Sequence, residues 1–340
     1  MTTRDQFISE IRGKLILLEK IIGRTPLYEL KFPEFGTNRV FVKIEFNNPS
    51  GSHYDRVYLE LFKELLNNNK ASLNISENSY LMEISSGNAG ISFAFFCKYL
   101  GFKNAELILP VGIPLNTIQI IKSINPELKI SQPPSPWSDK YLQGCVEYLK
   151  TEKLKSRPIF LNHSRKEKTL EATKNIASES IAQLINLGIE KIDYFIAACG
   201  NGSTIVGPGT ILKDRYPSIK IIVFEPKQAP VGYLKKYNTS INSGNNNPYK
   251  HKLYGTGAWG IKFPFIHDDK YKFCDIVDEV RLVDDKYIDD SLKLKYKLPF
   301  SVGYTSLVGL HIILNYISEI KCQNSVFLII FYDTGEKYGI

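Results

Sequence analysis

The chain has 340 residues, of which 43% are hydrophobic and 23% charged, and this composition excludes a disordered protein. That length suits two domains or one large α/β unit, and no apolar run reaches the roughly 18 residues that a membrane helix needs. The net charge of +8 invites a nucleic-acid interpretation, but Lys and Arg are spread along the chain without a basic stripe. We therefore expect neither a nucleic-acid nor a membrane partner.

The cysteines and histidines show no pattern typical of a disulfide framework or a metal site. The five cysteines are widely scattered, with no Cys-x-x-Cys pair, and the five histidines lack a metal-ligand spacing. We expect no metal. The first residues lack a basic-then-apolar leader, which predicts a cytoplasmic protein.

The first half of the chain alternates helix and strand patterns. Apolar spacing over residues 5–22 predicts an amphipathic helix, which a Gly-Arg-Thr-Pro turn ends. Short apolar runs then predict strands, each followed by helical spacing. In chain order we expect a strand at 40–45, a helix at 54–66, a strand at 81–84, a helix to about 100, a strand at 105–109 and a helix after Pro114.

The second half continues this alternation after a proline-rich loop at 132–136. We expect strands at 192–197, 220–224 and 325–331, and a helix at 307–317. An Asn/Ser/Gly-rich stretch at 238–247 predicts a mobile connection. Strands alternating with helices predict an α/β fold with parallel-rich sheets flanked by helices.

Residues 48–56 read Asn-Pro-Ser-Gly-Ser-His-Tyr-Asp-Arg. This segment resembles the Asn-Pro-x-Gly-Ser-x-Lys-Asp-Arg motif of the cysteine synthase and cystathionine β-synthase family, fold-type II enzymes that use pyridoxal phosphate (PLP). Every fixed position matches except the Schiff-base lysine, where this chain has Tyr54. In the family that lysine binds the cofactor and moves the α-proton. A phenol forms no such imine, and its reference pKa is about 10, so the resemblance predicts the fold and leaves the activity open.

The resemblance implies a two-domain architecture like that of the tryptophan synthase β subunit. We expect a larger cofactor-binding domain from residues 1–45 plus 152–340, and a smaller domain from 46–151 that carries the loop for the substrate carboxylate. It also implies a homodimer. A second motif, Ile-Gly-Arg-Thr-Pro-Leu at 22–27, supports the same family.

Residues 85–90, Ser-Ser-Gly-Asn-Ala-Gly, lie between an expected strand and an expected helix, where the helix N-terminus suits an anion. They resemble the family's Thr-Ser-Gly-Asn-Thr-Gly loop, which grips the substrate carboxylate and whose Asn touches the PLP ring hydroxyl. A generic turn with local caps is the alternative. The resemblance predicts Ser85, Ser86, Gly87 and Ala89 as substrate-binding and Asn88 as cofactor-binding.

Residues 200–204, Gly-Asn-Gly-Ser-Thr, resemble the family's Gly-Thr-Gly-Gly-Thr cradle for the PLP phosphate. Glycines let the backbone approach a phosphate, and successive amides form an anion nest. A plain turn is the alternative, and Pro208 is unusual because proline inside a helix removes a hydrogen bond. The resemblance predicts as cofactor-binding Gly200, Asn201, Gly202, Ser203 and Thr204.

Two further segments carry the resemblance to the C-terminus. Residues 303–306 match a Gly-Ile-Ser-Ser motif whose first Ser contacts the pyridine nitrogen, which predicts Thr305 as a cofactor ligand. The loop 251–258 matches one that lines the active-site entrance and predicts Gly255 as substrate-binding. Residues 160–177 match poorly, so the substrate stays open. Lys43 lies on an expected strand and is expected to point away from the cofactor.

Three functions remain open. The first is a diverged enzyme that binds PLP without a covalent link and uses Tyr54 or His53 for proton transfer in an altered β-replacement or elimination reaction on a serine- or cysteine-derived substrate. The second is an inactive paralogue that binds an amino-acid-like ligand or regulates a partner, with or without PLP. The third is an ordinary β-replacement enzyme in which Tyr54 is an engineered or sporadic change. His53 facing away from the pocket is the alternative to its catalytic role.

Overall fold

The computed structural model describes residues 3–67, 75–240 and 251–340, and the chain separates into two compact units. The smaller unit comprises residues 1–23 and 48–169, and the larger unit residues 24–47 and 170–340. Residues 1–23 and 152–169 thus belong to the smaller unit, whereas the sequence expectation had put them in the larger domain. Most of the expected mobile connection at 238–247 lies outside the described residues.

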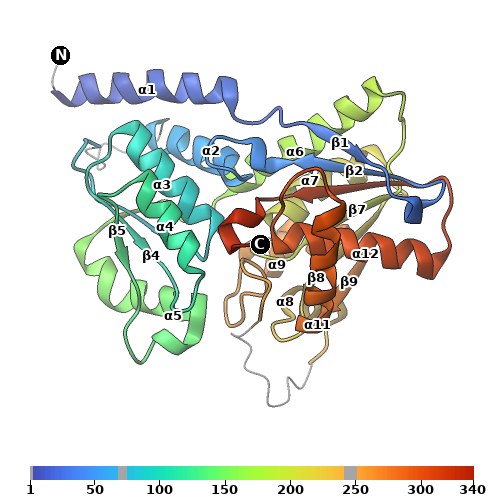
Figure 1. The fold of residues 1–340 in the computed structure, drawn as a ribbon. Coiled ribbons are helices and arrows are strands. Elements are labelled where there is room, and N and C mark those ends of the chain that lie inside the picture. Colours follow the sequence, from blue (N-terminus) through green and yellow to red (C-terminus); the bar gives the residue numbers. More distant parts are fainter. Residues whose placement is uncertain (1–2, 68–74, 241–250) are drawn as a thin grey trace. The chain divides into compact units, whose positions relative to one another are not determined.

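The smaller unit is built on a parallel sheet in the order β5–β4–β3–β6. Helices α2, α3 and α4 follow one another in contact, and α1 packs on α2 and α3 (Figure 1). That packing explains why the N-terminal helix belongs here. The elements are α1 (Thr3–Ile21), α2 (Tyr54–Asn67), β3 (Leu81–Ile84), α3 (Asn88–Leu100), β4 (Ala105–Ile108), α4 (Leu115–Ile124), β5 (Lys129–Ser131), α5 (Tyr141–Tyr148) and β6 (Ile159–Phe160).

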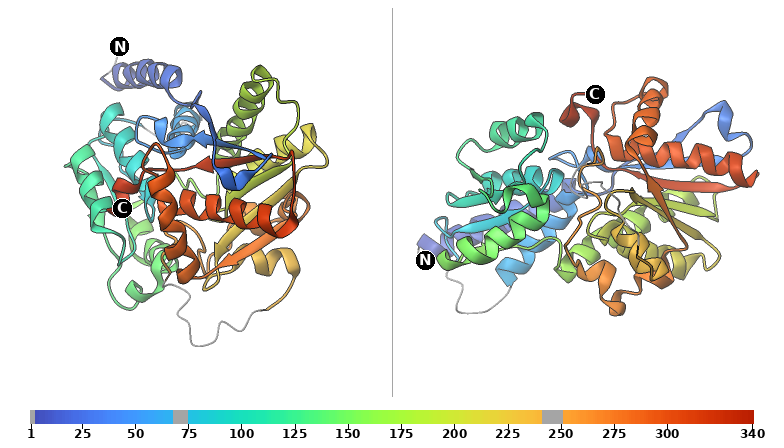
Figure 2. Two further views of the ribbon diagram at one scale, coloured as in Figure 1. Left: turned by 45° about the vertical axis from the view of Figure 1, so that its right-hand side comes forward. Right: turned by 90° about the horizontal axis from the view of Figure 1, so that it is seen from below.

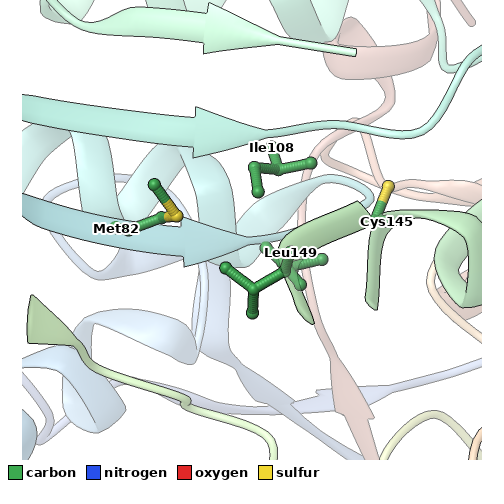
Figure 3. Packing of buried hydrophobic residues seen from close by; sticks show 5 residues of the cluster. Met82, Ile108, Cys145 and Leu149 are labelled. Atoms are coloured by element: carbon green, nitrogen blue, oxygen red, sulfur yellow. The ribbon is translucent and has the colours of Figure 1, made fainter. Parts of the chain in front are cut away.

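Successive side chains of β3 and β4 point to opposite faces of this sheet, and the two faces pack against different elements. Met82 and Ile108 pack with Cys145 of α5 and with Leu149, the first residue of the short helix that follows α5 (Figure 3). The neighbouring positions point the other way, and on that face a Cβ at Gly90 of α3 would lie 2.8 Å from Leu107 Cδ2. Glu83 pairs in register with Leu107, so this carboxylate belongs to the face that α3 covers.

The larger unit contains a six-stranded sheet in the order β1–β2–β10–β7–β8–β9, parallel except for the β1–β2 pair. Helix α12 runs along this sheet against β7 and β10 (Figure 2). The elements are β1 (Leu27–Leu30), β2 (Arg39–Ile44), α6 (Glu167–Asn186, which begins before the unit boundary), β7 (Tyr194–Ala198), α7 (Ser203–Arg215), β8 (Lys220–Pro226), α8 (Val231–Tyr237), α9 (Pro264–His267), α10 (Phe273–Ile276), β9 (Glu279–Val283), α11 (Asp285–Ser291), α12 (Tyr304–Ile320) and β10 (Val326–Phe331).

The predicted α/β class with parallel-rich sheets is confirmed. Strand β3 has the predicted bounds, and β10 begins one residue later than predicted. Helix α7 continues through Pro208, and at Gly207 it packs so closely that a Cβ would lie 2.2 Å from Thr173 Oγ1 of α6. The small residues around Pro208 therefore serve close helix packing.

Candidate functional site

Position 54 is the first residue of α2, and its side chain is half-buried. The Tyr54 ring lies beside two histidine rings. Its centroid is 4.2 Å from that of His53, with a 37° tilt, and 5.3 Å from that of His163, with the rings nearly perpendicular at 86°. His53 is buried and adjoins Tyr54. The structure therefore places the rings of Tyr54 and His53, predicted as catalytic, in contact, with a further histidine, His163, beside them.

The segment before Tyr54 is anchored by the buried carboxylate of Asp55. Asp55 accepts the backbone N–H of Ser50 at 2.6 Å and the hydroxyl of Ser92, on α3, at 2.5 Å. The amide of Tyr54 lies 3.4 Å from Ser52 Oγ. These contacts hold the start of α2 against α3, so position 54 has a defined place within the smaller unit.

The loop at 85–90 is shaped by one serine. Ser85 Oγ accepts the N–H of Gly87 at 3.0 Å and that of Gly90 at 2.7 Å. Gly90 itself is required, because a Cβ there would meet Leu107 Cδ2 and Ser85 Cβ at 2.8 and 3.2 Å. Ser85 and Ala89 are buried, whereas the half-buried residues at the N-terminus of α3 are Ser86, Gly87 and Asn88. These last three are the positions from which the loop can meet an anion.

Below this loop, a carboxylate is buried on β3. Glu83 accepts the N–H of Ile84 at 2.9 Å and the N–H of His163 at 3.2 Å. His163 Nδ1 lies 3.3 Å from the same carboxylate oxygen, in a bent approach. Burial, and then the charge of Glu83, hold the pKa of the Tyr58 phenol well above its usual value. The pairing of β6 with β3 brings Glu83 and His163 together across 80 positions.

In the larger unit, the loop between β7 and α7 closes around two glycines. A Cβ at Gly200 would lie 2.7 Å from the carbonyl oxygen of Gly255, and one at Gly202 would lie 2.8 Å from Ile266 Cγ1. Gly202 also has a φ of 91°, in the left-handed region that favours glycine. The loop therefore has the steric requirement that a phosphate cradle imposes.

The side chain of Asn201 supplies this loop with one hydrogen-bond acceptor, Oδ1, and one donor group, Nδ2. Its Oδ1 accepts the N–H of Ser203 at 2.9 Å. Within the part of the chain that the structure describes, its buried Nδ2 has no acceptor. Ser203 and Thr204 are buried at the start of α7, a 13-residue helix. An unused donor at a helix N-terminus fits a phosphate.

Neighbouring loops support this cradle. The N–H of Gly257 donates to Cys199 O at 3.1 Å, and the N–H of Ala198 donates to the Tyr332 hydroxyl at 3.0 Å. Burial is the main reason that the pKa of Tyr332 rises to about 12, so its hydroxyl stays protonated at neutral pH. Gly255, whose carbonyl oxygen faces Gly200, therefore lies beside the glycine loop, and its substrate-binding role stays a prediction.

Thr305 is buried in the first turn of α12. Gly303, the residue before this helix, packs so closely that a Cβ would lie 2.2 Å from Asp333 Oδ1. Asp333 in turn accepts the Tyr338 hydroxyl at 2.6 Å. The C-terminal segment thus holds the start of α12 in place, and with it Thr305.

Lys43 does not replace a cofactor-binding lysine. Its side chain is fully buried within the larger unit, where Nζ donates to Thr25 O at 2.7 Å and to Gln183 Oε1 at 2.9 Å. Nζ also pairs with Glu179 at 2.8 Å. An amine engaged by three acceptors has a structural role.

The described residues were also compared with the patterns of metal sites and of membrane-spanning helices. Over residues 3–67, 75–240 and 251–340, no group of three or more His, Cys, Asp or Glu side chains is placed to hold a metal ion. Among the helices of these same segments, none combines the length and apolar character that crossing a membrane requires.

The sequence of this chain is similar to that of pyridoxal-phosphate dependent enzymes. The model of the pyridoxal-phosphate dependent enzyme family matches residues 18–331. Cysteine synthase B of Campylobacter jejuni is 29% identical over 94% of this chain and 96% of its own length. A probable cysteine synthase of Bacillus subtilis is 26% identical over 94% of both chains.

Solved structures agree on the fold. A hydrogen sulfide-producing enzyme of Fusobacterium nucleatum superposes with a TM-score of 0.76 at 24% identity, covering 94% of this chain and 98% of the other. An O-acetylserine dependent cystathionine β-synthase of Helicobacter pylori gives 0.77 at 22% identity, covering 95% and 96%. At these identities the structures support the fold-type II architecture alone.

Proposed function

Because the chain belongs to the pyridoxal-phosphate dependent enzyme family, with cysteine synthases among its relatives, we propose that it is a diverged cysteine synthase-like protein. It binds PLP without a covalent lysine link and takes an amino-acid ligand derived from serine or cysteine. The observation that carries this proposal is the glycine loop at 200–204. Two glycines there exclude any side chain, and Asn201 keeps an unused buried donor.

Each predicted residue has a task in this proposal. The glycine loop binds the phosphate through backbone amides and Asn201 Nδ2, and Thr305 donates or accepts at the pyridine nitrogen. Asn88 contacts the ring hydroxyl. When bound, PLP supplies an electron sink for carbanion chemistry. The ligand's carboxylate is held by the loop of Ser85, Ser86, Gly87 and Ala89, with Gly255 at the entrance.

The proton steps fall to the side chains at the start of α2. Tyr54 has a hydroxyl where the family has an amine, and His53 lies against it. We propose that these groups accept and return the ligand's α-proton, so that the chemistry is an altered β-replacement or elimination. Histidine and tyrosine both serve as general acids and bases in enzymes.

A second candidate is an inactive protein that binds an amino-acid-like ligand or a partner. This candidate is favoured by the hydrogen bonds within the loop at 85–90. The N–H groups of Gly87 and Gly90 already donate to Ser85 Oγ. Because its own serine holds the loop in shape, the loop keeps its conformation whether or not the protein catalyses a reaction. Binding of L-serine with no chemical change would favour this candidate.

We also propose that the protein pairs with a second copy. Three large apolar side chains of α1 are more than half exposed: Ile16, Leu17 and Ile21. An exposed apolar helix face is typical of an interaction surface. A monomer mass from light scattering at micromolar concentration would contradict this proposal.

The deciding experiment is an absorbance titration of the purified protein with PLP, followed by borohydride reduction and peptide mass mapping. We expect saturable binding and no peptide that carries a reduced PLP adduct. Absence of binding would reject the PLP proposal and leave the second candidate. A labelled lysine would show that a covalent link exists after all.

A further inference from the structure

A buried acid–histidine pair lies in the smaller unit beside Tyr54. The side chains of Glu83 and His163 are 1% and 8% exposed, and their nearest charged atoms, Oε2 and Nδ1, are 3.3 Å apart. Within the described residues Glu83 has no Lys or Arg partner, and the imidazole of His163 is the basic side chain beside it. A buried carboxylate without compensation is costly, which gives the pair a physical reason to share a proton.

Both members are fixed by the backbone around them. Glu83 is held by the N–H groups of Ile84 and His163, while the carbonyl of His163 accepts Thr169 Oγ1 at 2.6 Å. A carboxylate placed this way against an imidazole nitrogen selects its tautomer and orientation, because an ionised carboxylate only accepts hydrogen bonds. Nδ1 forms no well-aligned hydrogen bond among the described residues, so the 3.3 Å approach to Glu83 is the feature that favours a proton on Nδ1 and leaves Nε2 as the base.

The other titratable groups of this cluster come from the elements packed around the pair. Tyr54 and Tyr58 of α2 have ring centroids 5.3 and 6.1 Å from that of His163, and the His53 ring lies 4.2 Å from that of Tyr54. Cys97 of α3 completes the set, and burial and then Glu83 hold its pKa well above the usual value. Histidine is the side chain that exchanges protons near neutral pH, so His163 is the acid–base member that Glu83 orients.

We propose that Glu83, His163 and Tyr54 form a proton relay that takes over the proton-transfer task of the absent lysine. The relay rests on the proposed function, in which Tyr54 faces the ligand. The phenol O–H bond breaks and an N–H bond forms at His163 Nε2, while Glu83 balances the resulting imidazolium. The phenolate then takes the ligand's α-proton, and the reverse steps return both protons. Glu83 and His163 are positioning residues that act through Tyr54.

The ring geometry is compatible with this relay. The perpendicular contact at 5.3 Å places the imidazole ring beside the phenol ring, and the relay requires the Tyr54 hydroxyl and His163 Nε2 to come within hydrogen-bond distance, directly or through a water, when the ligand binds. Catalytic hydrogen bonds are often long or poorly aligned until a ligand is bound. The general acid–base arrangement of a carboxylate, an imidazole and a hydroxyl recurs on unrelated folds.

The first test needs no cofactor. In a ¹⁵N-histidine NMR titration, with His163→Gln to assign the signal, we expect neutral His163 to carry its proton on Nδ1. Glu83→Gln should change the ¹⁵N signals of His163 and the balance between its two neutral tautomers. The matched control is Glu106→Gln, which alters another buried carboxylate of the same sheet and should leave the ¹⁵N signals of His163 unchanged. A His163 signal that ignores Glu83→Gln overturns the relay.

The second test measures proton transfer. With PLP bound, exchange of the α-hydrogen of L-serine with D₂O should fall at least about a hundredfold in His163→Phe, which keeps a ring against Tyr54 but carries no proton. Tyr54→Phe should lose exchange as well, while PLP affinity in both stays within about twofold of wild type. Wild-type exchange in His163→Phe, or a PLP-loaded wild type that exchanges nothing, overturns the relay.

The two tests separate the relay from the proposed function. If the wild type binds no PLP, the proposed function is wrong, and the NMR titration still decides whether Glu83 controls His163. If PLP binds and the NMR coupling is absent, the proposed function survives and the relay is wrong.

Discussion

The glycine loop of the larger unit and the start of α2 in the smaller unit have diverged in opposite ways. At 200–204 the side chains have changed, but the steric requirement for glycine at positions 200 and 202 is intact. At 48–56 nearly every residue resembles the family motif, but Tyr54 stands at the position where that motif has its Schiff-base lysine. Anion binding by backbone amides tolerates side-chain change, whereas covalent catalysis depends on a single atom.

The substitution Tyr54→Lys tests the difference at position 54 and has the largest expected effect. If the cofactor loops are intact, this variant should gain a borohydride-reducible link to PLP, changing labelling of the residue-54 peptide from undetectable to nearly complete. Turnover need not follow, because a small misplacement of the substrate costs about a hundredfold in rate. The measurement is peptide mass mapping after reduction, with Tyr54→Phe as the unlabelled control. A Tyr54→Lys variant that binds PLP but stays unlabelled would mean that residue 54 does not face the cofactor aldehyde.

The other side of the comparison is tested at Gly200. In Gly200→Ala the added Cβ would lie 2.7 Å from Gly255 O, so backbone must move, and we expect PLP affinity to fall at least about tenfold, or 1.4 kcal/mol. The matched control is Gly13→Ala in α1, where a Cβ meets nothing within 4 Å. That control should bind PLP like the wild type. Equal affinity in both variants would remove the glycine loop from the proposed site.

Much of this fold was predictable from the sequence, and for a physical reason. Strand β10 is a continuous apolar run, and β3 is apolar except for Glu83; both are buried along their whole length, which is the pattern of a parallel sheet. Helix α6 was missed because its segment matches the family motif poorly and mixes charged and apolar residues. The Glu83–His163 contact was also missed, since it depends on the pairing of β6 with β3 and has no local signal.

The buried carboxylate of Glu106 provides a stability test of the smaller unit. Burial opposes ionisation of Glu106 on β4, but Lys153, Ser131, Tyr80 and Lys129 together lower its pKa to about 2. A lowered carboxyl pKa contributes stability that is present above the unfolded pKa and lost as pH falls through the folded one. We therefore expect the Glu106 contribution, about 1–3 kcal/mol, to disappear between about pH 4.5 and pH 2.

Urea unfolding at pH 7 and at pH 3 measures this contribution in wild type and in Glu106→Gln. The variant should be less stable at pH 7, and the difference should shrink at pH 3. A difference that does not change with pH would mean that Glu106 acts by packing rather than by charge. Both outcomes give the free energy of unfolding of the wild type, and with it the stability of the protein whose smaller sheet carries Glu106.

The smallest expected effect is at Asn201. Its Oδ1 caps the N–H of Ser203, and its buried Nδ2 is without an acceptor among the described residues. If that donor binds the cofactor phosphate, Asn201→Ala should weaken PLP binding by about 2- to 10-fold, as loss of one hydrogen bond of about 0.5–1.5 kcal/mol predicts. Asn201→Asp keeps the acceptor for Ser203 but sets a negative charge against the phosphate, so its affinity should fall further than that of Asn201→Ala. Titrations of both variants with PLP and with unphosphorylated pyridoxal locate the effect, since the two variants should differ from wild type for PLP alone. Equal losses for both ligands would assign Asn201 to the shape of the loop and not to the phosphate.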